Sequence, residues 1–270
     1  MAKRTLIVVG LVLGAASILS AHDLFMKLGS YMVEPHSTVE LTLMNGTFTS
    51  SESEVAADRV VDISLVSPTG RETLEASTLA TSGNTTALEA RTGGPGTYVA
   101  GLSLRKRVLK LEAASFNDYL EHEGIPDALE ARRRDGELEE DVAERYSKHV
   151  KAIFQVGDDR TDGFSTVLGY PAELVPLQNP YEAHPGSELE FRALVDGSPV
   201  AHQVVLAGGR NADGAFDEVS TRTDEHGIAR FTLAAAGDWY VKFISMVKVT
   251  DGGATYESTW TTLTFALPEK

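Results

Sequence analysis

Apolar and polar residues alternate along most of this chain, in short runs separated by turns rich in glycine and proline. A period of two places the apolar side chains on one face of a strand, so each run predicts a half-buried β-strand. The clearest runs lie towards the two ends of the chain, at 38–43, 60–66, 97–104, 188–195, 228–233, 239–244 and 260–265. This pattern predicts a mainly β protein made of immunoglobulin-like, antiparallel β-sandwich modules.

The middle of the chain, at 115–155, has a different periodicity. Its apolar residues recur at intervals of three or four, which is the spacing of one face of a helix. The residues that carry this pattern are Leu138, Val142, Tyr146, Val150 and Ile153. The sequence therefore predicts a helical insertion, with its longest helix running up to Gly157.

The two β-rich regions on either side of this insertion predict two modules. Residues 22–178 are expected to form an N-terminal β-sandwich that carries the helical insertion. Residues 179–270 are expected to form a C-terminal immunoglobulin-like β-sandwich. A single continuous sandwich with a helical lid is the alternative organisation.

The first residues have the three parts of a secretory signal peptide. Lys3 and Arg4 give a positive start, an apolar run follows, and small residues end the segment at Ala21. The apolar run is shorter than the roughly 20 residues that a membrane helix needs. Residues 1–21 are therefore predicted to be a signal peptide, and the mature protein is expected to be periplasmic or secreted, with no membrane span after cleavage.

Cleavage after Ala21 would make His22 the first residue of the mature protein. An N-terminal histidine carries a free α-amine and an imidazole, which together can chelate a divalent metal ion. Nitrogen donors of this kind suit copper, nickel or zinc better than calcium, so His22 is the candidate metal ligand. Cleavage after Ala16 satisfies the small-residue rule better, because Gly14 lies two residues before it, and that cut would abolish the chelate.

The other six histidines are weaker candidates: His36, His122, His149, His184, His202 and His226. Two of them adjoin prolines at strand starts, and the others are expected on exposed segments or at the edge of the predicted helix. The chain has no cysteine, which excludes disulfides, thiolate metal sites and a cysteine nucleophile. Its net charge of −15 makes nucleic acid a poor partner.

Short motifs spread over the mature chain are similar to those of the DUF4198 family of exported bacterial proteins. They are Ala21–Asp23, Phe116–Leu120, Glu144–Lys148, Glu173–Tyr181, Gly237–Trp239 and Tyr256–Ser258. The resemblance implies a β-rich exported protein associated with periplasmic nickel or cobalt uptake. The chain departs from the family pattern at Ser245, where a histidine is expected before the methionine, so any metal ligand at that place would be missing here.

These observations predict an exported, non-enzymatic protein that handles or senses a divalent transition metal, with nickel, cobalt or copper as the candidate ions. An inner-membrane metal transporter or another envelope protein is the expected partner. A metal-independent β-sandwich interaction module is the alternative. A third possibility is an oxidative copper enzyme with an N-terminal histidine brace, which would need a second histidine on the same face as His22.

Overall fold

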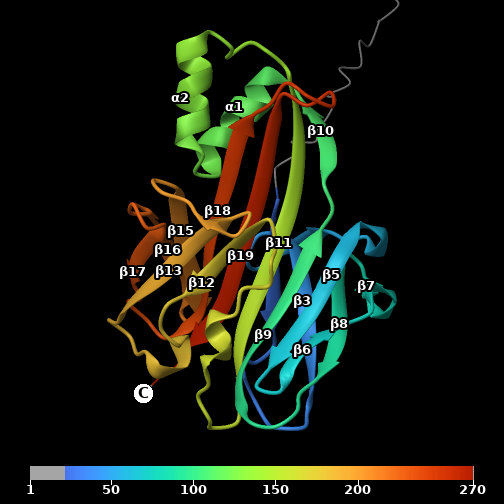
Figure 1. Cartoon of the computed structure of the whole chain (residues 1–270), viewed down its shortest axis with the longest axis vertical. Coiled ribbons are helices and arrows are strands. Elements are labelled where there is room, and N and C mark those ends of the chain that lie inside the picture. The colour runs from blue at the N-terminus through green and yellow to red at the C-terminus, as the bar shows by residue number, and fades with distance from the viewer. Residues whose placement is uncertain (1–21, 270) are drawn as a thin grey trace, which may run out of the picture.

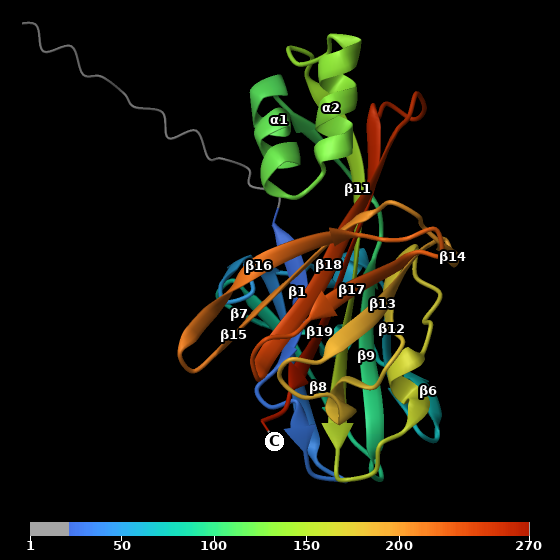
Figure 2. The ribbon, with the colours of Figure 1, turned by 90° about the vertical axis from the view of Figure 1, so that its left-hand side faces the viewer.

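The structure is a computed structural model that describes residues 22–269, so the predicted signal peptide at 1–21 lies outside it. Within this range the chain is mainly β, with two α-helices at one end of the molecule (Figures 1 and 2). The prediction of a mainly β, immunoglobulin-like sandwich protein is confirmed. No helix in this part of the chain is long and apolar enough to cross a membrane.

The largest sheet has ten strands and runs through the centre of the molecule (Figure 1). Two of its long central strands pair in parallel, whereas most of its other neighbours are antiparallel. In spatial order the main strands are β16 (Gly214–Arg222), β15 (Val204–Asn211), β18 (Gly237–Lys248), β19 (Tyr256–Leu267), β11 (Val142–Val156), β9 (Gly96–Leu104), β5 (Val60–Ser67) and β6 (Gly70–Thr73). Two further strands pair with β11, namely β10 (Arg107–Leu111) and β2 (Met32–Val33).

Two smaller sheets complete the sandwich. The five-stranded sheet contains β1 (Asp23–Leu28), β3 (Thr38–Gly46), β8 (Thr85–Arg91), β7 (Ala80–Ser82) and β4 (Ser51–Ser53). The four-stranded sheet contains β12 (Ala172–Pro176), β13 (Glu188–Val195), β14 (Ser198–Pro199) and β17 (Ile228–Thr232). One hydrophobic cluster contains buried residues from all three sheets, so the sheets share a core.

The helices α1 (Ala113–His122) and α2 (Pro126–Asp135) cover one end of the large sheet (Figure 2). Phe116 and Leu120 are fully buried on α1, where they pack with Trp260 of β19 in a second apolar cluster. Tyr119 stacks on Trp260 with ring centroids 5.7 Å apart. Burying large aromatic side chains in this way holds the helical cap on the strand ends.

The prediction of a long helix up to Gly157 is wrong, because this segment forms the 15-residue strand β11. A spacing of four is an even number, so Val142, Tyr146 and Val150 lie on one face of a strand as well as on one face of a helix. From Ser147 onwards every residue of β11 is buried, and a strand buried on both faces shows no alternation. The helical part of the predicted insertion is therefore limited to α1 and α2.

Strands from both predicted modules join the large sheet. β11 and β9 come from the predicted N-terminal module, whereas β18 and β19 come from the predicted C-terminal one. β11 pairs with β19 in parallel from Glu144 to Ala152, and this pairing crosses the predicted boundary at 178/179. Folding of 22–178 and 179–270 as separate units stays a prediction.

Candidate functional site

His22 stands immediately before the first strand and is tied to the folded core. Its backbone carbonyl accepts a hydrogen bond from the Lys148 ammonium, which lies on β11. The same ammonium donates to Oδ1 of Asn45 at 3.1 Å. Burial lowers the pKa of Lys148 to about 8, while the negative charge of Asp23 partly opposes this change. The position of His22 is thus fixed by a buried partner on the central sheet.

The imidazole of His22 has one carboxylate neighbour. Its Nε2 lies 3.3 Å from Oε2 of Glu52, which is on β4. The negative charge of this carboxylate favours the tautomer with the proton on the nearby Nε2. The lone pair of Nδ1 is then free, and Nδ1 is the ring nitrogen nearer to the backbone nitrogen of the same residue.

A surface pocket of about 220 Å³ opens beside His22. Phe25, Phe48 and Tyr240 form one part of its lining, with ring centroids 4.9–5.4 Å apart. The polar part of the lining includes Glu52, Asp23 and Glu123. The pocket therefore combines an apolar wall with carboxylates.

Lys242 holds the carboxylates at the inner end of this pocket. Its Nζ lies 2.6 Å from Oδ2 of Asp23 and 3.2 Å from Oε2 of Glu123, and Glu218 is 3.9 Å away. Burial lowers the pKa of Lys242, but the neighbouring carboxylates outweigh it and raise that pKa above its usual value. Burial raises the pKa of Glu123, and the charge of Asp23 adds to the increase. Because Glu123 follows α1, this cluster also joins the helical cap to β1.

The side chains alone do not make a metal site. Among residues 22–269 no group of three or more His, Asp and Glu side chains is placed to hold a metal ion. The lining of the pocket contains no histidine besides His22, so the second histidine of a copper brace is missing from it. A metal ion at this place would need the α-amine of His22 as a ligand, and that amine exists only after cleavage behind Ala21.

The remaining histidines lie apart from this site. His36 and His202 have positive φ angles of 59°, so both occupy turns. His226 is exposed in a turn. Nδ1 of the exposed His122 is 2.7 Å from the Asp118 carbonyl oxygen, and Nδ1 of His184 is 3.0 Å from the Pro185 carbonyl oxygen. None of these histidines lines the pocket beside His22.

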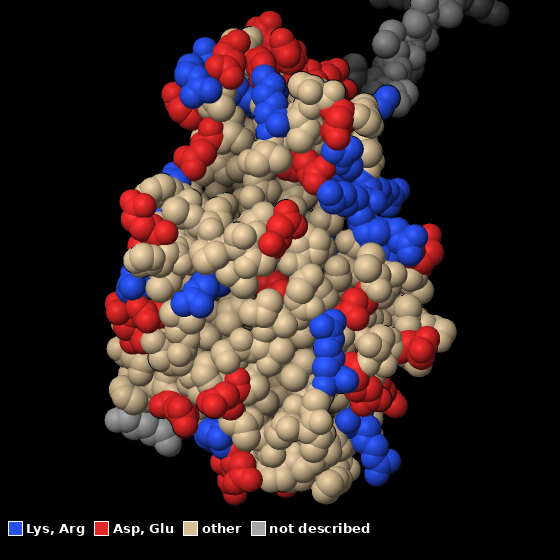
Figure 3. All heavy atoms as spheres, viewed as in Figure 1, with Lys and Arg blue, Asp and Glu red and all other residues tan. Residues whose placement is uncertain are grey.

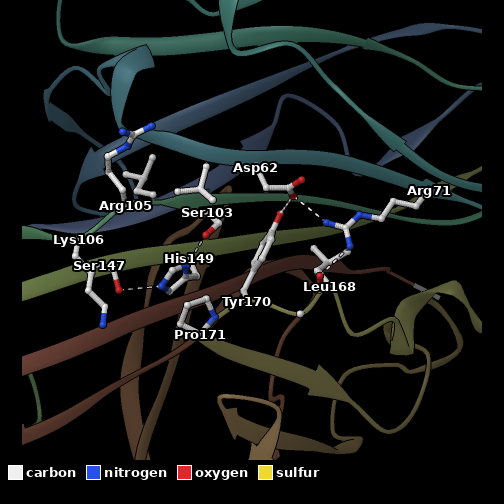
Figure 4. Close-up of a pocket in the computed structure, with 13 residues that line it drawn as sticks. Asp62, Arg71, Ser103, Arg105, Lys106, Ser147, His149, Leu168, Tyr170 and Pro171 are labelled. Atoms are coloured by element: carbon white, nitrogen blue, oxygen red, sulfur yellow. Dashed lines mark hydrogen bonds and ion pairs between the residues drawn. The ribbon is translucent and has the colours of Figure 1, made fainter.

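His149 is the exception, because it is buried on β11 in the lining of a second pocket (Figure 4). The sequence predicted a packed histidine at the edge of a helix and only a weak candidate ligand. Read as a strand, the segment places Ser147 and His149 on one face of β11, since they are two residues apart. Polar residues alternating within a strand of this length were the signal that could have revealed the site.

The sheets and their packing define an immunoglobulin-like β-sandwich protein. Within that class the chain belongs to the family described as a domain of unknown function (DUF4198), whose model matches residues 19–246. The family membership predicted from the sequence motifs is therefore confirmed. The family description states no activity, and no curated protein shows significant similarity to this chain.

Several solved structures resemble the chain at low identity. The D0–D1 domain of intimin is 11% identical, with 90% of this chain and 97% of that one covered and a TM-score of 0.20. A two-domain fibronectin type III segment of chicken tenascin is 12% identical, with 90% and 96% covered and a TM-score of 0.22. A DUF4785 family protein from Legionella pneumophila is 12% identical, with 80% and 50% covered and a TM-score of 0.25. TM-scores this low carry no argument about function.

Proposed function

We propose that this protein is exported and binds a divalent transition metal ion as cargo through the mature N-terminus at His22. The observation that carries the proposal is the 3.3 Å contact between His22 Nε2 and Glu52 Oε2. A carboxylate beside the second ring nitrogen helps to orient the imidazole of a metal-binding histidine. Here it would leave Nδ1 and the α-amine of the same residue to bind the ion.

The donor set fits the ions expected from the sequence. The α-amine and Nδ1 would close a six-membered chelate ring with the metal, and amine and imidazole nitrogens suit nickel, cobalt or copper. The carboxylate of Glu52 would supply negative charge near the ion, whereas Asp23 and Glu123 are already paired with Lys242. The buried hydrogen bond from Lys148 to the His22 carbonyl would keep the chelating residue in place.

Periplasmic location and delivery to an inner-membrane metal transporter or another envelope protein are part of this proposal. A cargo protein must release its ion, and two nitrogen ligands near the surface suit exchange better than a closed four-ligand site. The same proposal gives the protein no enzymatic activity, since the role assigned to His22 is to bind the ion.

Calorimetry with Cu²⁺ and Ni²⁺ tests the proposal. The authentic mature protein that begins at His22 should bind one ion tightly, and affinity should weaken from about pH 8 to about pH 5 because protons compete for both nitrogens. One alanine added before His22 moves the amine away from the imidazole and should weaken binding strongly. His226→Ala, a change in an exposed turn, is the matched control and should leave binding unchanged.

Binding that is absent, or that tolerates the added alanine, would contradict the proposal. The metal-independent interaction module would then be the better account, because the described side chains alone offer no cluster of three ligands.

A further inference from the structure

The second pocket, of about 290 Å³, is lined by β5, β9, β11 and the segment before β12, none of which lines the pocket beside His22. Ser103 of β9 and His149 and Ser147 of β11 form its polar part, as Figure 4 shows. Leu168 and Tyr170, from the segment before β12, form its apolar part. The rings of His149 and Tyr170 are 6.0 Å apart.

In the polar part of this pocket, one serine hydroxyl proton has no acceptor among the described residues. Nδ1 of His149 is 2.9 Å from Oγ of Ser103, and Nε2 is 3.0 Å from Oγ of Ser147. A neutral imidazole has one N–H and one lone pair, so it donates to one serine and accepts from the other. The serine that accepts keeps its own hydroxyl proton, and neither hydroxyl has another partner among residues 22–269.

His149 stays neutral at ordinary pH. Its pKa is lowered to about 4, mainly by burial; the charge of Glu173 opposes this change and the charge of Lys106 adds to it. Ser103, Ser147 and His149 are each no more than 4% exposed. A buried hydroxyl proton without an acceptor is costly, so a pocket that presents one is suited to a ligand with an acceptor atom.

The charges at the two ends of the pocket differ. At one end Oδ2 of the Asp62 carboxylate accepts hydrogen bonds from Tyr170 Oη and Arg71 Nη2 at 2.6 and 3.0 Å. At the other end lie Arg105 and Lys106 (Figure 4). Lys106 pairs with Glu257, whereas the Arg105 guanidinium has no ion-pair partner within the described part of the chain.

These two cations continue into a basic strip. Arg105, Lys106, Arg107 and Lys110 are all exposed along the end of β9 and β10. Figure 3 shows Lys and Arg side chains gathered on this face below the helical cap. In a chain with a net charge of −15, a local positive strip beside a pocket favours an anionic ligand there.

We propose that this pocket binds a small organic carboxylate whose apolar body lies against Leu168 and Tyr170. The carboxylate would accept the spare serine hydroxyl proton and face the cationic end at Arg105. A volume of about 290 Å³ is at the small end of the range for ligand pockets, so the ligand is of the size of a single ring or a short chain.

Saturation-transfer NMR with benzoate tests this site in the mature protein, with a chelator present to remove metal from the His22 site. Benzoate should bind, and benzyl alcohol, which has the same ring without the charge, should bind at least about tenfold more weakly because a hydrogen bond to a charged group is the stronger kind. Arg105→Gln, a surface change that preserves the fold, should weaken benzoate binding several-fold. Arg107→Gln, in the same basic strip but outside the lining, should not.

A second variant distinguishes the contribution of the pocket serines to benzoate binding from that of the basic strip. Replacing both Ser103 and Ser147 by alanine should abolish the preference for benzoate over benzyl alcohol, with folding checked by circular dichroism. If that pair does not fold, a shift of the His149 ring resonances on adding benzoate to the unaltered protein provides the same information. Equal binding of the two probes, no benzoate binding at millimolar concentration, or equal effects of Arg105→Gln and Arg107→Gln would overturn the proposal.

Discussion

His22 and His149 lie in two pockets of the same sandwich, yet their surroundings give them opposite chemistry. The His22 side chain is 24% exposed and its neighbour is a carboxylate 3.3 Å away. His149 is 2% exposed and lies between two serine hydroxyls. The comparison shows that the neighbours of a histidine decide its role. Acidic groups, together with the α-amine that cleavage after Ala21 would free, make His22 a candidate for cations, whereas hydroxyls and nearby cations make the His149 pocket a candidate for anions.

The two pockets also differ in how they are supported. Lys148 fixes the backbone at His22 through one hydrogen bond to a carbonyl. The wall of the His149 pocket depends on Glu173, whose carboxylate accepts backbone N–H groups from Leu168, Gly169 and Tyr170 at 2.7–2.9 Å. The same carboxylate pairs with the buried Lys151 at 3.0 Å. Changes at Glu173 should therefore affect one pocket and leave the other intact.

The largest effect is expected from Glu173→Ala. Removing one partner of a buried ion pair leaves the Lys151 ammonium uncompensated, which costs about 3–5 kcal/mol of unfolding free energy. Urea denaturation of the variant measures this loss, with the exposed Glu188→Ala as control. A loss below about 1 kcal/mol would show that Glu173 does not support the pocket wall.

A smaller effect is expected from the titration of His149. The pKa of His149 is about 4 in the folded protein and about 6.5 in the unfolded chain. Between these two pH values the unfolded chain binds a proton that the folded protein does not bind. Stability should therefore fall as the pH drops from about 6.5 to about 4, with a contribution of about 2.5 kcal/mol at pH 4.5.

Comparison with His149→Gln isolates this contribution, because the other titrating groups are common to both proteins. The difference in unfolding free energy between wild type and variant should change between pH 7 and pH 4.5, whereas His226→Ala should follow the wild-type curve. A difference that is independent of pH would mean that His149 is hydrated in the folded protein.

The smallest effect is expected from Glu52→Ala at the other pocket. Loss of a carboxylate that orients a ligating imidazole typically lowers metal affinity about 10- to 100-fold without abolishing binding. Calorimetry with Ni²⁺ measures the change, and Glu72→Ala on the exposed strand β6 is the control. Unchanged affinity would show that Glu52 does not orient His22.

Much of the β architecture could be predicted from the sequence, because strands such as β3 and β13 are buried mainly on one face and the others are bounded by clear turn residues. The runs at 38–43, 97–104, 188–195 and 239–244 lie within β3, β9, β13 and β18. The strand β11 could not be predicted from periodicity, since it is buried on both faces and its even spacing of apolar residues imitates a helix. Its parallel pairing with β19 joins residues more than 100 positions apart, and no local pattern encodes such a contact.

The two pockets were predictable to different degrees for the same reason. His22 could be proposed from the sequence because a local motif, the predicted end of a signal peptide, would give it a free α-amine. Its neighbour Glu52 comes from another strand, so only the fold brings them together. Ser103 and His149 are 46 residues apart and meet because β9 and β11 pair in the large sheet.

Native mass spectrometry of the protein exported to the periplasm and purified without chelator tests the central claim most directly. The measured masses identify both the first residue of the mature chain and the bound ion in one experiment. The account predicts a chain that begins at His22 and carries one nickel, cobalt or copper ion, which is lost from a variant with one alanine before His22. A chain that begins at Ser17 or Asp23, or one that begins at His22 and binds no ion when these metals are supplied, would contradict it.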